Sequence, residues 1–246
     1  MSERLAVVSG GTRGIGLACT ERLVKLGHRV VALYRSDETA AKELTARHGD
    51  AVVPLRVDVA DPDAVRAVAA QVLGEHGAPR VLVNNAGVNI DRPFLELTDE
   101  DWRTVLDTNL SGAFYLTRSF ARPMLELGDA VVVNVGATTG IRPRLNGANY
   151  CASKAGLLQL TKCLALELAP AVRVNCLIPG MTETAELVTR FGLDDPARRE
   201  AVLAEIPAHR IGTVHEIADA LEFLVGDHSG YLTGQKLVVD GGQFMW

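Results

Sequence analysis

The sequence predicts an α/β fold of one domain, a doubly wound parallel sheet of seven strands with helices on both faces. Short β-branched runs alternate with longer helical stretches, and these runs are apolar almost throughout. Strands that are apolar on both faces are typical of a parallel sheet covered by helices on both sides. No internal repeat or low-complexity linker divides the 246 residues, so residues 1–246 are expected to form one domain.

Each predicted strand is a short apolar run. The seven runs are Leu5–Val8, Arg29–Leu33, Val52–Leu55, Val81–Val83, Val131–Val133, Val172–Val174 and Leu237–Val239. Gly27 is expected to end the first helix, and Thr98, followed by three acidic residues, to begin a later one. Residues 181–212 are rich in charge and are interrupted by Pro196 and Pro207. This irregular stretch is a candidate substrate lid.

Composition argues against several classes of protein. The net charge is −5 and the sequence pI about 5.7, without a basic run, so no nucleic-acid partner is expected. No apolar run approaches the ~20 residues of a membrane helix, and no leader precedes the first strand, so we expect a cytoplasmic protein without a membrane partner. Dispersed histidines predict no metal site. The cysteines, which form no Cys-x-x-Cys, are expected to be reduced and buried: Cys19, Cys151, Cys163 and Cys176.

A glycine-rich loop joins the first predicted strand to the first helix. Its residues are Ser9, Gly10, Gly11, Thr12, Arg13, Gly14, Ile15 and Gly16. Glycines let the backbone turn tightly and approach a pyrophosphate, which then sits at the positive end of the helix. The spacing is Gly-x-x-x-Gly-x-Gly, and such a loop alone is often a plain turn. Its place between a strand and a helix favours a Rossmann-type dinucleotide site.

The end of the second predicted strand bears on the choice of cofactor. A carboxylate there would accept both hydroxyls of the adenine ribose and favour NAD. The chain instead carries Arg35 and Ser36 at this point. Arg35 can pair with a 2′-phosphate, and Arg13 in the glycine loop can reach the same place, whereas the nearby Asp37 argues the other way. We therefore expect NADP.

An ordered set of motifs resembles the short-chain dehydrogenase/reductase family, and most closely its bacterial 3-oxoacyl-[acyl-carrier-protein] reductases. The resemblance runs from end to end of the chain. After the glycine loop its motifs are Asp58-Val59, Asn84-Asn85-Ala86-Gly87, Asn109, Tyr150-Cys151-Ala152-Ser153-Lys154, Pro179-Gly180, Tyr231-Leu232-Thr233-Gly234-Gln235 and Asp240-Gly241-Gly242.

The resemblance implies a role for most of these residues. Asp58 and Val59 would hold adenine, while Asn109 would hold a water molecule in a proton relay. The residues that would line the adenine ribose and brace the sheet are Asn85, Ala86 and Gly87, and those that would cradle the nicotinamide are Pro179, Gly180, Thr182 and Thr184. Asn85 and Asn109 have a purely structural alternative, in which they tie loops and helices together. The resemblance also implies a homotetramer.

Tyr150 and Lys154 are the candidate catalytic pair. They stand four residues apart on a predicted helix and therefore share a face. An adjacent ammonium favours the phenolate and is expected to lower the tyrosine pKa from its usual ~10. Lys154 can also hold the nicotinamide ribose. Tyr150 would then give its proton to a carbonyl oxygen as hydride reaches the carbon.

The sequence departs from the family at position 137. The family places a serine thirteen residues before the tyrosine, where it donates a hydrogen bond to the substrate carbonyl, but this chain has Ala137. Three explanations stay open: an introduced serine-to-alanine change, a hydroxyl supplied by Thr138, and a protein that naturally lacks full activity. Loss of such a donor costs ~10²–10³ in turnover.

A second departure concerns the carrier protein. Members of the family that act on carrier-bound substrates place basic residues before the fifth strand and after the catalytic helix. Residues 125–129 and 168–171 are acidic or apolar here, which makes an acyl carrier protein a doubtful partner. The sequence thus predicts an NADPH-dependent ketoreductase for a small or medium ketone, with Arg142, Arg144, Leu145, Asn146 and the 181–212 lid lining the pocket. The alternatives are an alcohol dehydrogenase working in reverse and a nucleotide-binding protein with little or no turnover.

Overall fold

A single sheet of seven parallel strands organises the computed structural model, which describes residues 4–245. The strands are β1 (Arg4–Ser9), β2 (His28–Tyr34), β3 (Val52–Arg56), β4 (Val81–Asn84), β5 (Ala130–Val135), β6 (Val172–Pro179) and β7 (Lys236–Val239). Their order in the sheet is β3-β2-β1-β4-β5-β6-β7, and every neighbouring pair is parallel. Each predicted strand lies inside an observed one, so the predicted fold class is confirmed. The strand order reverses between β1 and β4, where such sheets bind ligands.

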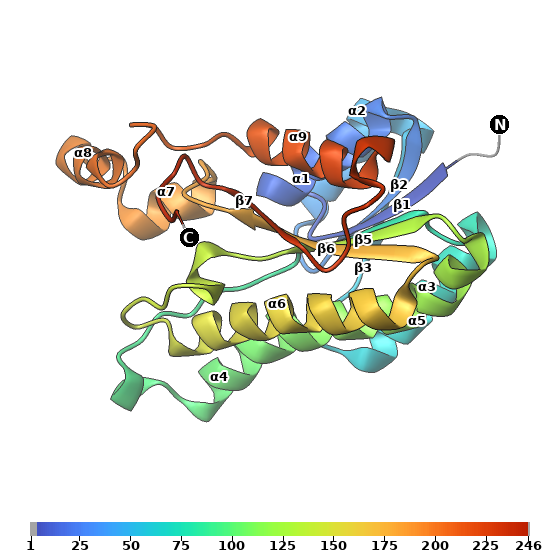
Figure 1. Cartoon of the computed structure of the whole chain (residues 1–246), viewed down its shortest axis with the longest axis horizontal. Coiled ribbons are helices and arrows are strands. Elements are labelled where there is room, and N and C mark those ends of the chain that lie inside the picture. The colour runs from blue at the N-terminus through green and yellow to red at the C-terminus, as the bar shows by residue number, and fades with distance from the viewer. Residues whose placement is uncertain (1–3, 246) are drawn as a thin grey trace.

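Helices cover both faces of the sheet. The helices are α1 (Gly14–Lys25), α2 (Glu38–His48), α3 (Pro62–His76), α4 (Asp99–Leu106), α5 (Gly112–Leu127), α6 (Ala148–Leu168), α7 (Ala185–Phe191), α8 (Pro196–Ala204) and α9 (Val214–Val225). Short turns of helix are η1 (Gly49–Ala51), η2 (Phe94–Glu96), η3 (Asp107–Ser111), η4 (Thr138–Gly140) and η5 (Asp227–Ser229). Figure 1 shows α1, α2 and α9 on one face and α3, α4, α5 and α6 on the other.

Two apolar layers hold the helices on the sheet. On one side Leu23 of α1 and Leu221 of α9 pack with Val30 of β2, and all three are fully buried. On the other side Phe120 of α5 packs with Leu82 of β4. Because both faces of the central strands are buried in this way, their sequences are continuous apolar runs rather than alternating ones.

The predicted helix boundaries are confirmed by the local geometry. Gly27 has a φ of +83° directly after α1, a conformation that favours glycine. Thr98 caps α4: its hydroxyl accepts a hydrogen bond from the Asp101 amide, and the Asp101 carboxylate accepts one from the Thr98 amide. This reciprocal arrangement is a capping box.

The prediction that residues 181–212 are irregular was wrong. The segment contains α7 and α8, and Pro196 is the first residue of α8, where its missing amide hydrogen costs nothing. Leu187, Leu193, Ile206 and Ile211 form a small core of its own. A bridge between Thr182 and Gly212 closes its base. The segment is therefore a compact helical segment, and Figure 1 shows its helices α7 and α8 on the side of the molecule where the C-terminus lies.

The cysteine prediction was right for two positions. Cys19 and Cys176 are buried, whereas Cys151 is half-buried and Cys163 is exposed. The prediction of burial is wrong for Cys163, because α6 turns this position away from the sheet. An apolar residue type within a helix is therefore not by itself evidence of burial. Within residues 4–245 none of the helices is long and apolar enough to cross a membrane. The same residues contain no histidine, cysteine or carboxylate cluster suited to a metal ion.

Candidate active site

One cavity of about 910 Å³ is formed by the loops that follow the carboxyl ends of the strands. The sequence-predicted residues in its lining are Gly10, Thr12, Arg13, Gly14, Ile15, Gly16, Arg35, Ser36, Asp58, Val59, Asn85, Ala86, Gly87, Ala137, Tyr150, Lys154, Pro179, Gly180, Thr182 and Thr184. Of the predicted catalytic and cofactor-binding residues, Asn109 alone is absent from this lining. The chain therefore brings the separate motifs to one place, at the edge where the loops of parallel strands meet.

The glycine loop leaves the backbone open to the cavity. Gly10 has a φ of +64°, and a Cβ on Gly16 would collide with the carbonyl oxygen of Gly10. The Asn85 side chain donates to the carbonyl oxygens of Ser9 (3.0 Å) and Gly10 (3.2 Å), which fixes the loop. Asn85 thus braces the glycine loop, and because it also lines the cavity its role toward the adenine ribose stays a prediction. The first turn of α1 has no acidic residue and no side-chain cap, so its amide hydrogens remain available to an anion.

Two arginines stand beside the glycine loop without ionic partners. Arg13 and Arg35 are exposed, line the cavity and form no ion pair with any residue from 4 to 245. Asp37, which argued against NADP, caps α2: its carboxylate accepts a hydrogen bond from the Ala40 amide at 3.0 Å. This end of the cavity therefore offers two guanidinium groups without ion-pair partners among residues 4–245, and the Asp37 carboxylate, which lines the cavity while one of its oxygens caps α2.

Tyr150 and Lys154 share the cavity side of α6. The Lys154 Nζ lies 5.7 Å from the centre of the Tyr150 ring and donates to the Val135 carbonyl oxygen at 2.8 Å. Burial lowers the pKa of Lys154 to about 8. Burial also raises the pKa of Tyr150 to about 12, and the opposing positive charge of Arg190 does not overcome it. The expected lowering of the tyrosine pKa was therefore wrong for the protein alone, because loss of hydration outweighs nearby charge.

Asn109 lies in η3, a π-helical turn that joins α4 to α5. Its carboxamide oxygen accepts from the Val88 amide at 2.7 Å. Its amide nitrogen donates to the Val88 carbonyl oxygen at 2.9 Å and to the Ser153 hydroxyl at 3.1 Å. Asn109 thus ties the loop after β4 to α6: it holds Val88, which is next to Gly87 in the cavity wall, and Ser153, which is about one helical turn from Tyr150. Its role in a water relay stays a prediction.

Ala137 lies two residues after the end of β5, in an extended conformation on the cavity wall. The next two residues also line the cavity and both carry hydroxyls. Thr138 is buried and begins η4, while the Thr139 hydroxyl is buried and has no hydrogen-bond partner within residues 4–245. The sequence offered only Thr138 as a substitute for the missing serine, and the fold adds Thr139 as a second candidate.

The substrate end of the cavity is bounded by charged side chains. Arg144 binds Asp91 with both terminal nitrogens (2.6 and 2.7 Å) and also donates to Asn89 at 2.7 Å. Arg142 and Arg144 line the wall as predicted. Leu145 and Asn146 do not, because they occupy an outward turn in which Leu145 is 90% exposed and Asn146 has a φ of +59°.

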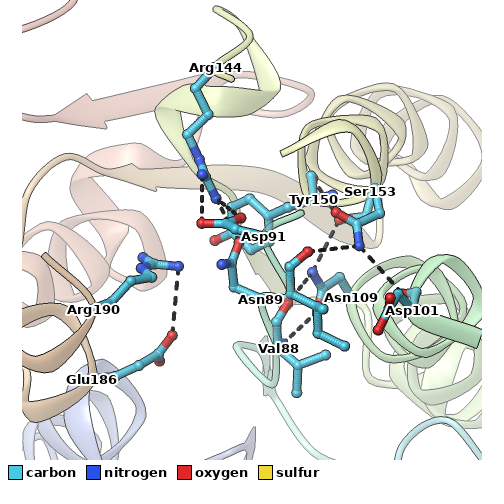
Figure 2. Close-up of polar contacts among 12 residues, drawn as sticks. Val88, Asn89, Asp91, Asp101, Asn109, Arg144, Tyr150, Ser153, Glu186 and Arg190 are labelled. Atoms are coloured by element: carbon cyan, nitrogen blue, oxygen red, sulfur yellow. Dashed lines mark hydrogen bonds and ion pairs between the residues drawn. The ribbon is translucent and has the colours of Figure 1, made fainter. Parts of the chain in front are cut away.

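Part of the remaining lining was predicted and part was missed. Glu186 and Arg190 of α7 belong to the 181–212 segment that was expected to line the pocket, whereas the sequence did not predict Asn89 after β4 or Gln243 and Phe244 near the C-terminus. Figure 2 shows Glu186 and Arg190 on one side of the site and Asn89, Asp91, Arg144 and Tyr150 on the other. The charge density of residues 181–212 was the sequence signal for Glu186 and Arg190, and no motif indicated Asn89, Gln243 or Phe244.

The fold and the converging loops define a dinucleotide-binding α/β protein, and comparisons with known proteins narrow this class. A family model described as enoyl-(acyl carrier protein) reductase matches residues 10–243. The 3-oxoacyl-[acyl-carrier-protein] reductase FabG of Salmonella typhimurium is 37% identical over 243 residues, 98% of each chain. FabG of Escherichia coli is 36% identical with the same coverage, and Nodulation protein G of a Rhizobium species is 35% identical over 100% of this chain and 98% of its own.

Solved structures agree with these relatives. A protein of Agrobacterium tumefaciens, provisionally assigned as a gluconate dehydrogenase, superposes with a TM-score of 0.92 at 31% identity, covering 98% of this chain and 95% of its own. The gox2181 structure also gives a TM-score of 0.92, at 33% identity, covering 100% and 97%. The chain belongs to the short-chain dehydrogenase/reductase family. It is an oxidoreductase of that family, similar along its whole length to the FabG ketoreductases.

Proposed function

We propose that this protein is an NADPH-dependent ketoreductase in which Tyr150 is the proton donor. The observation that carries the proposal is the meeting of the glycine loop, Lys154 and Tyr150 in one cavity. The family supports a nicotinamide cofactor, and the two uncommitted arginines support the form with a 2′-phosphate.

The residues present fit such a cofactor. Gly10, Gly16 and Gly180 shape this site by allowing close packing behind it. A Cβ on Gly10 would lie 2.9 Å from the Asn85 side-chain nitrogen, one on Gly16 would collide with the Gly10 carbonyl oxygen, and one on Gly180 would lie 2.5 Å from Cβ of Asp240. The open amides at the start of α1 and the charges of Arg13 and Arg35 would hold phosphate groups. Bound there, the cofactor supplies the hydride.

The remaining chemistry belongs to the chain. With its pKa near 12, Tyr150 is a neutral phenol at physiological pH and carries the proton that the ketone oxygen must receive. Lys154, fixed by its bond to Val135, presents the remaining ammonium hydrogens to the cavity. Its positive charge would stabilise the phenolate left after proton transfer. Position 137 adds no hydrogen bond to the oxygen, so we expect slow turnover.

An alcohol dehydrogenase working in reverse would use the same residues, because Tyr150 serves as the acid in one direction and as the base in the other. Burial raises the pKa of Tyr150 to about 12, so the phenol that donates the proton to a ketone is the form present at neutral pH. The binding-only alternative rests on Ala137 alone, whereas the rest of the cavity lining carries the expected residues. Ketone reduction is therefore the proposal that more of the site supports.

The substrate is proposed to be a free small molecule. FabG relatives are named as reductases of substrates on acyl carrier protein, which would dock through basic residues. Here Asp129 at the start of β5 pairs with Arg80, and residues 168–171 carry no charge. We also propose cytoplasmic location and a homotetramer, following the family.

The test is reduction of a panel of small ketones, followed by NADPH absorbance, with the parent protein and Tyr150→Phe. The parent should reduce at least one ketone slowly, with NADPH and poorly with NADH. Tyr150→Phe should abolish this rate while leaving NADPH affinity within about twofold, because the phenyl ring has no proton to give. Equal rates for the two proteins on every ketone would remove Tyr150 from the mechanism.

A further inference from the structure

Three arginines line the substrate end of the cavity, and their partners differ. Arg144 is bound on two sides by the Asp91 carboxylate and on a third by Asn89. Arg142 is exposed and lies over the ring of Phe244, at 5.8 Å from its centre. Among residues 4–245 the ion pair of Arg190 is the one with Glu186, at 3.8 Å on the same helix. The three arginines therefore differ in how many existing contacts each would have to give up to bind an incoming anion.

Arg190 faces the catalytic tyrosine from across the cavity. Figure 2 shows its guanidinium directed from α7 toward the wall that carries Asn89, Arg144 and Tyr150. Among the charged groups around Tyr150, Arg190 has the largest influence on the tyrosine pKa, ahead of Glu186, Arg144 and Asp91. An anion held by Arg190 would therefore lie close to the ketone that Tyr150 protonates.

Arg190 is free to change partners. Its pair with Glu186 is long, and the Glu186 side chain is 68% exposed, so water replaces Arg190 there at little cost. The Phe191 ring, 5.2 Å from the guanidinium carbon, supports the side chain. By contrast, Arg144 would have to give up a bidentate pair and a hydrogen bond.

We propose that Arg190 binds a carboxylate of the substrate, so that the preferred substrates are short 2-oxo or 3-oxo acids. The proposal rests on the ketoreductase function argued above and names its substrate class. Arg190 and Tyr150 line one cavity from opposite sides, so the carboxylate and the ketone can belong to one small molecule, and 2-oxo and 3-oxo acids are the shortest such compounds (Figure 2). Glu186 and Glu205 also line this region and would repel longer dianionic compounds.

Binding without turnover gives the first test. Oxamate is a non-reducible analogue of a 2-oxo acid, and ethyl oxamate is its uncharged counterpart. Calorimetric titration of the NADPH-saturated protein should show oxamate binding at least tenfold tighter than ethyl oxamate. Arg190→Ala should weaken oxamate binding ~10- to 100-fold and leave ethyl oxamate unchanged, and Arg190→Lys should restore part of the loss. Arg198→Ala is the matched control, because Arg198 lies on α8 outside the cavity lining and should change neither affinity.

Turnover of pyruvate against ethyl pyruvate, and of acetoacetate against ethyl acetoacetate, gives the second test. The acids should have the higher kcat/KM, and Arg190→Ala should remove this preference mainly through KM. Selective oxamate binding without turnover of any ketone would overturn the reductase function and keep the carboxylate site. Reduction of the esters, with equal oxamate affinity in the parent and Arg190→Ala, would overturn the carboxylate site and keep the reductase.

Discussion

Ala137→Ser should raise the reductase rate ~10²-fold or more, with NADPH affinity nearly unchanged. The structure has space for the change, because Ala137 faces a cavity of about 910 Å³ and its extended backbone suits any residue. The new hydroxyl would lie beside the substrate oxygen, far from the glycine loop that would dominate cofactor binding. It would act on the developing alkoxide more than on the ground-state ketone, so the gain should appear in kcat.

The size of the gain follows from the donors already present. A phenol with a pKa near 12 is a weak acid, so the developing negative charge depends on a second hydrogen-bond donor. One such donor is worth ~10²–10³ in rate, or about 3–4 kcal/mol. If a threonine hydroxyl already supplies this bond, the serine should add less than about threefold.

Steady-state rates on one ketone that the parent reduces measurably distinguish the cases. In the favoured case Ala137→Ser is fast, and Thr138→Val and Thr139→Val resemble the parent. If Thr138 or Thr139 is the donor, its valine variant should lose ~10²-fold and the serine variant should gain little. A rate for Ala137→Ser within about twofold of the parent, with both threonine variants also unchanged, would refute the reasoning that a donor is missing.

Three further outcomes follow from the structure. Arg35→Ala should weaken NADP binding by ~1.5–3 kcal/mol and leave NAD binding unchanged, because only NADP has the 2′-phosphate; equal affinities of the parent for the two cofactors in a titration would contradict this. Lys154→Met should abolish turnover yet raise the melting temperature at pH 7. Burial lowers the Lys154 pKa from 10.5 to about 8, so the folded ammonium costs about 3 kcal/mol below pH 8, less the hydrogen bond to Val135 that the variant loses. This cost fades between pH 8 and 10.5, so a stability difference between the two proteins that stays constant across that range would disprove it. Leu166 of α6 is 83% exposed in the protomer, and Leu166→Asp should shift a tetramer to smaller species in sedimentation at unchanged circular dichroism; sedimentation of the parent as a monomer would rule out the tetramer.

The strands of the sheet could be predicted from the sequence because each strand is defined by its own short run of residues. A parallel strand buried on both faces must be apolar at nearly every position, and the run at residues 131–133 shows this without any tertiary information. The position of the cofactor motifs could be predicted for a related reason. Gly10, Asp58 and Pro179 lie within two residues of the ends of parallel strands, so the topology alone brings them to one edge.

What the sequence did not predict depends on packing between distant segments. Arg190 faces Tyr150 only because the 181–212 segment folds on its own small core and closes at Thr182 and Gly212. Burial raises the pKa of Tyr150, and this effect is larger than that of Lys154, the charged residue that the sequence motif identifies. Each of these features depends on contacts between residues that lie far apart in the sequence, so no short stretch of sequence predicts it.

The orientation of α6 shows how buried polar groups place the catalytic pair. Asn84 of β4 donates to the Asn134 side chain at 2.8 Å, and Asn134 of β5 donates to the Thr161 hydroxyl of α6 at 2.9 Å. These side chains are buried, where an unpaired polar group is costly, so the chain of bonds permits one rotation of α6 over the sheet. That rotation turns Lys154 and Tyr150, about two and three turns of helix away from Thr161, toward the cavity. An apolar contact between helix and sheet would tolerate small rotations, whereas this network ties the geometry of the candidate site to the centre of the fold.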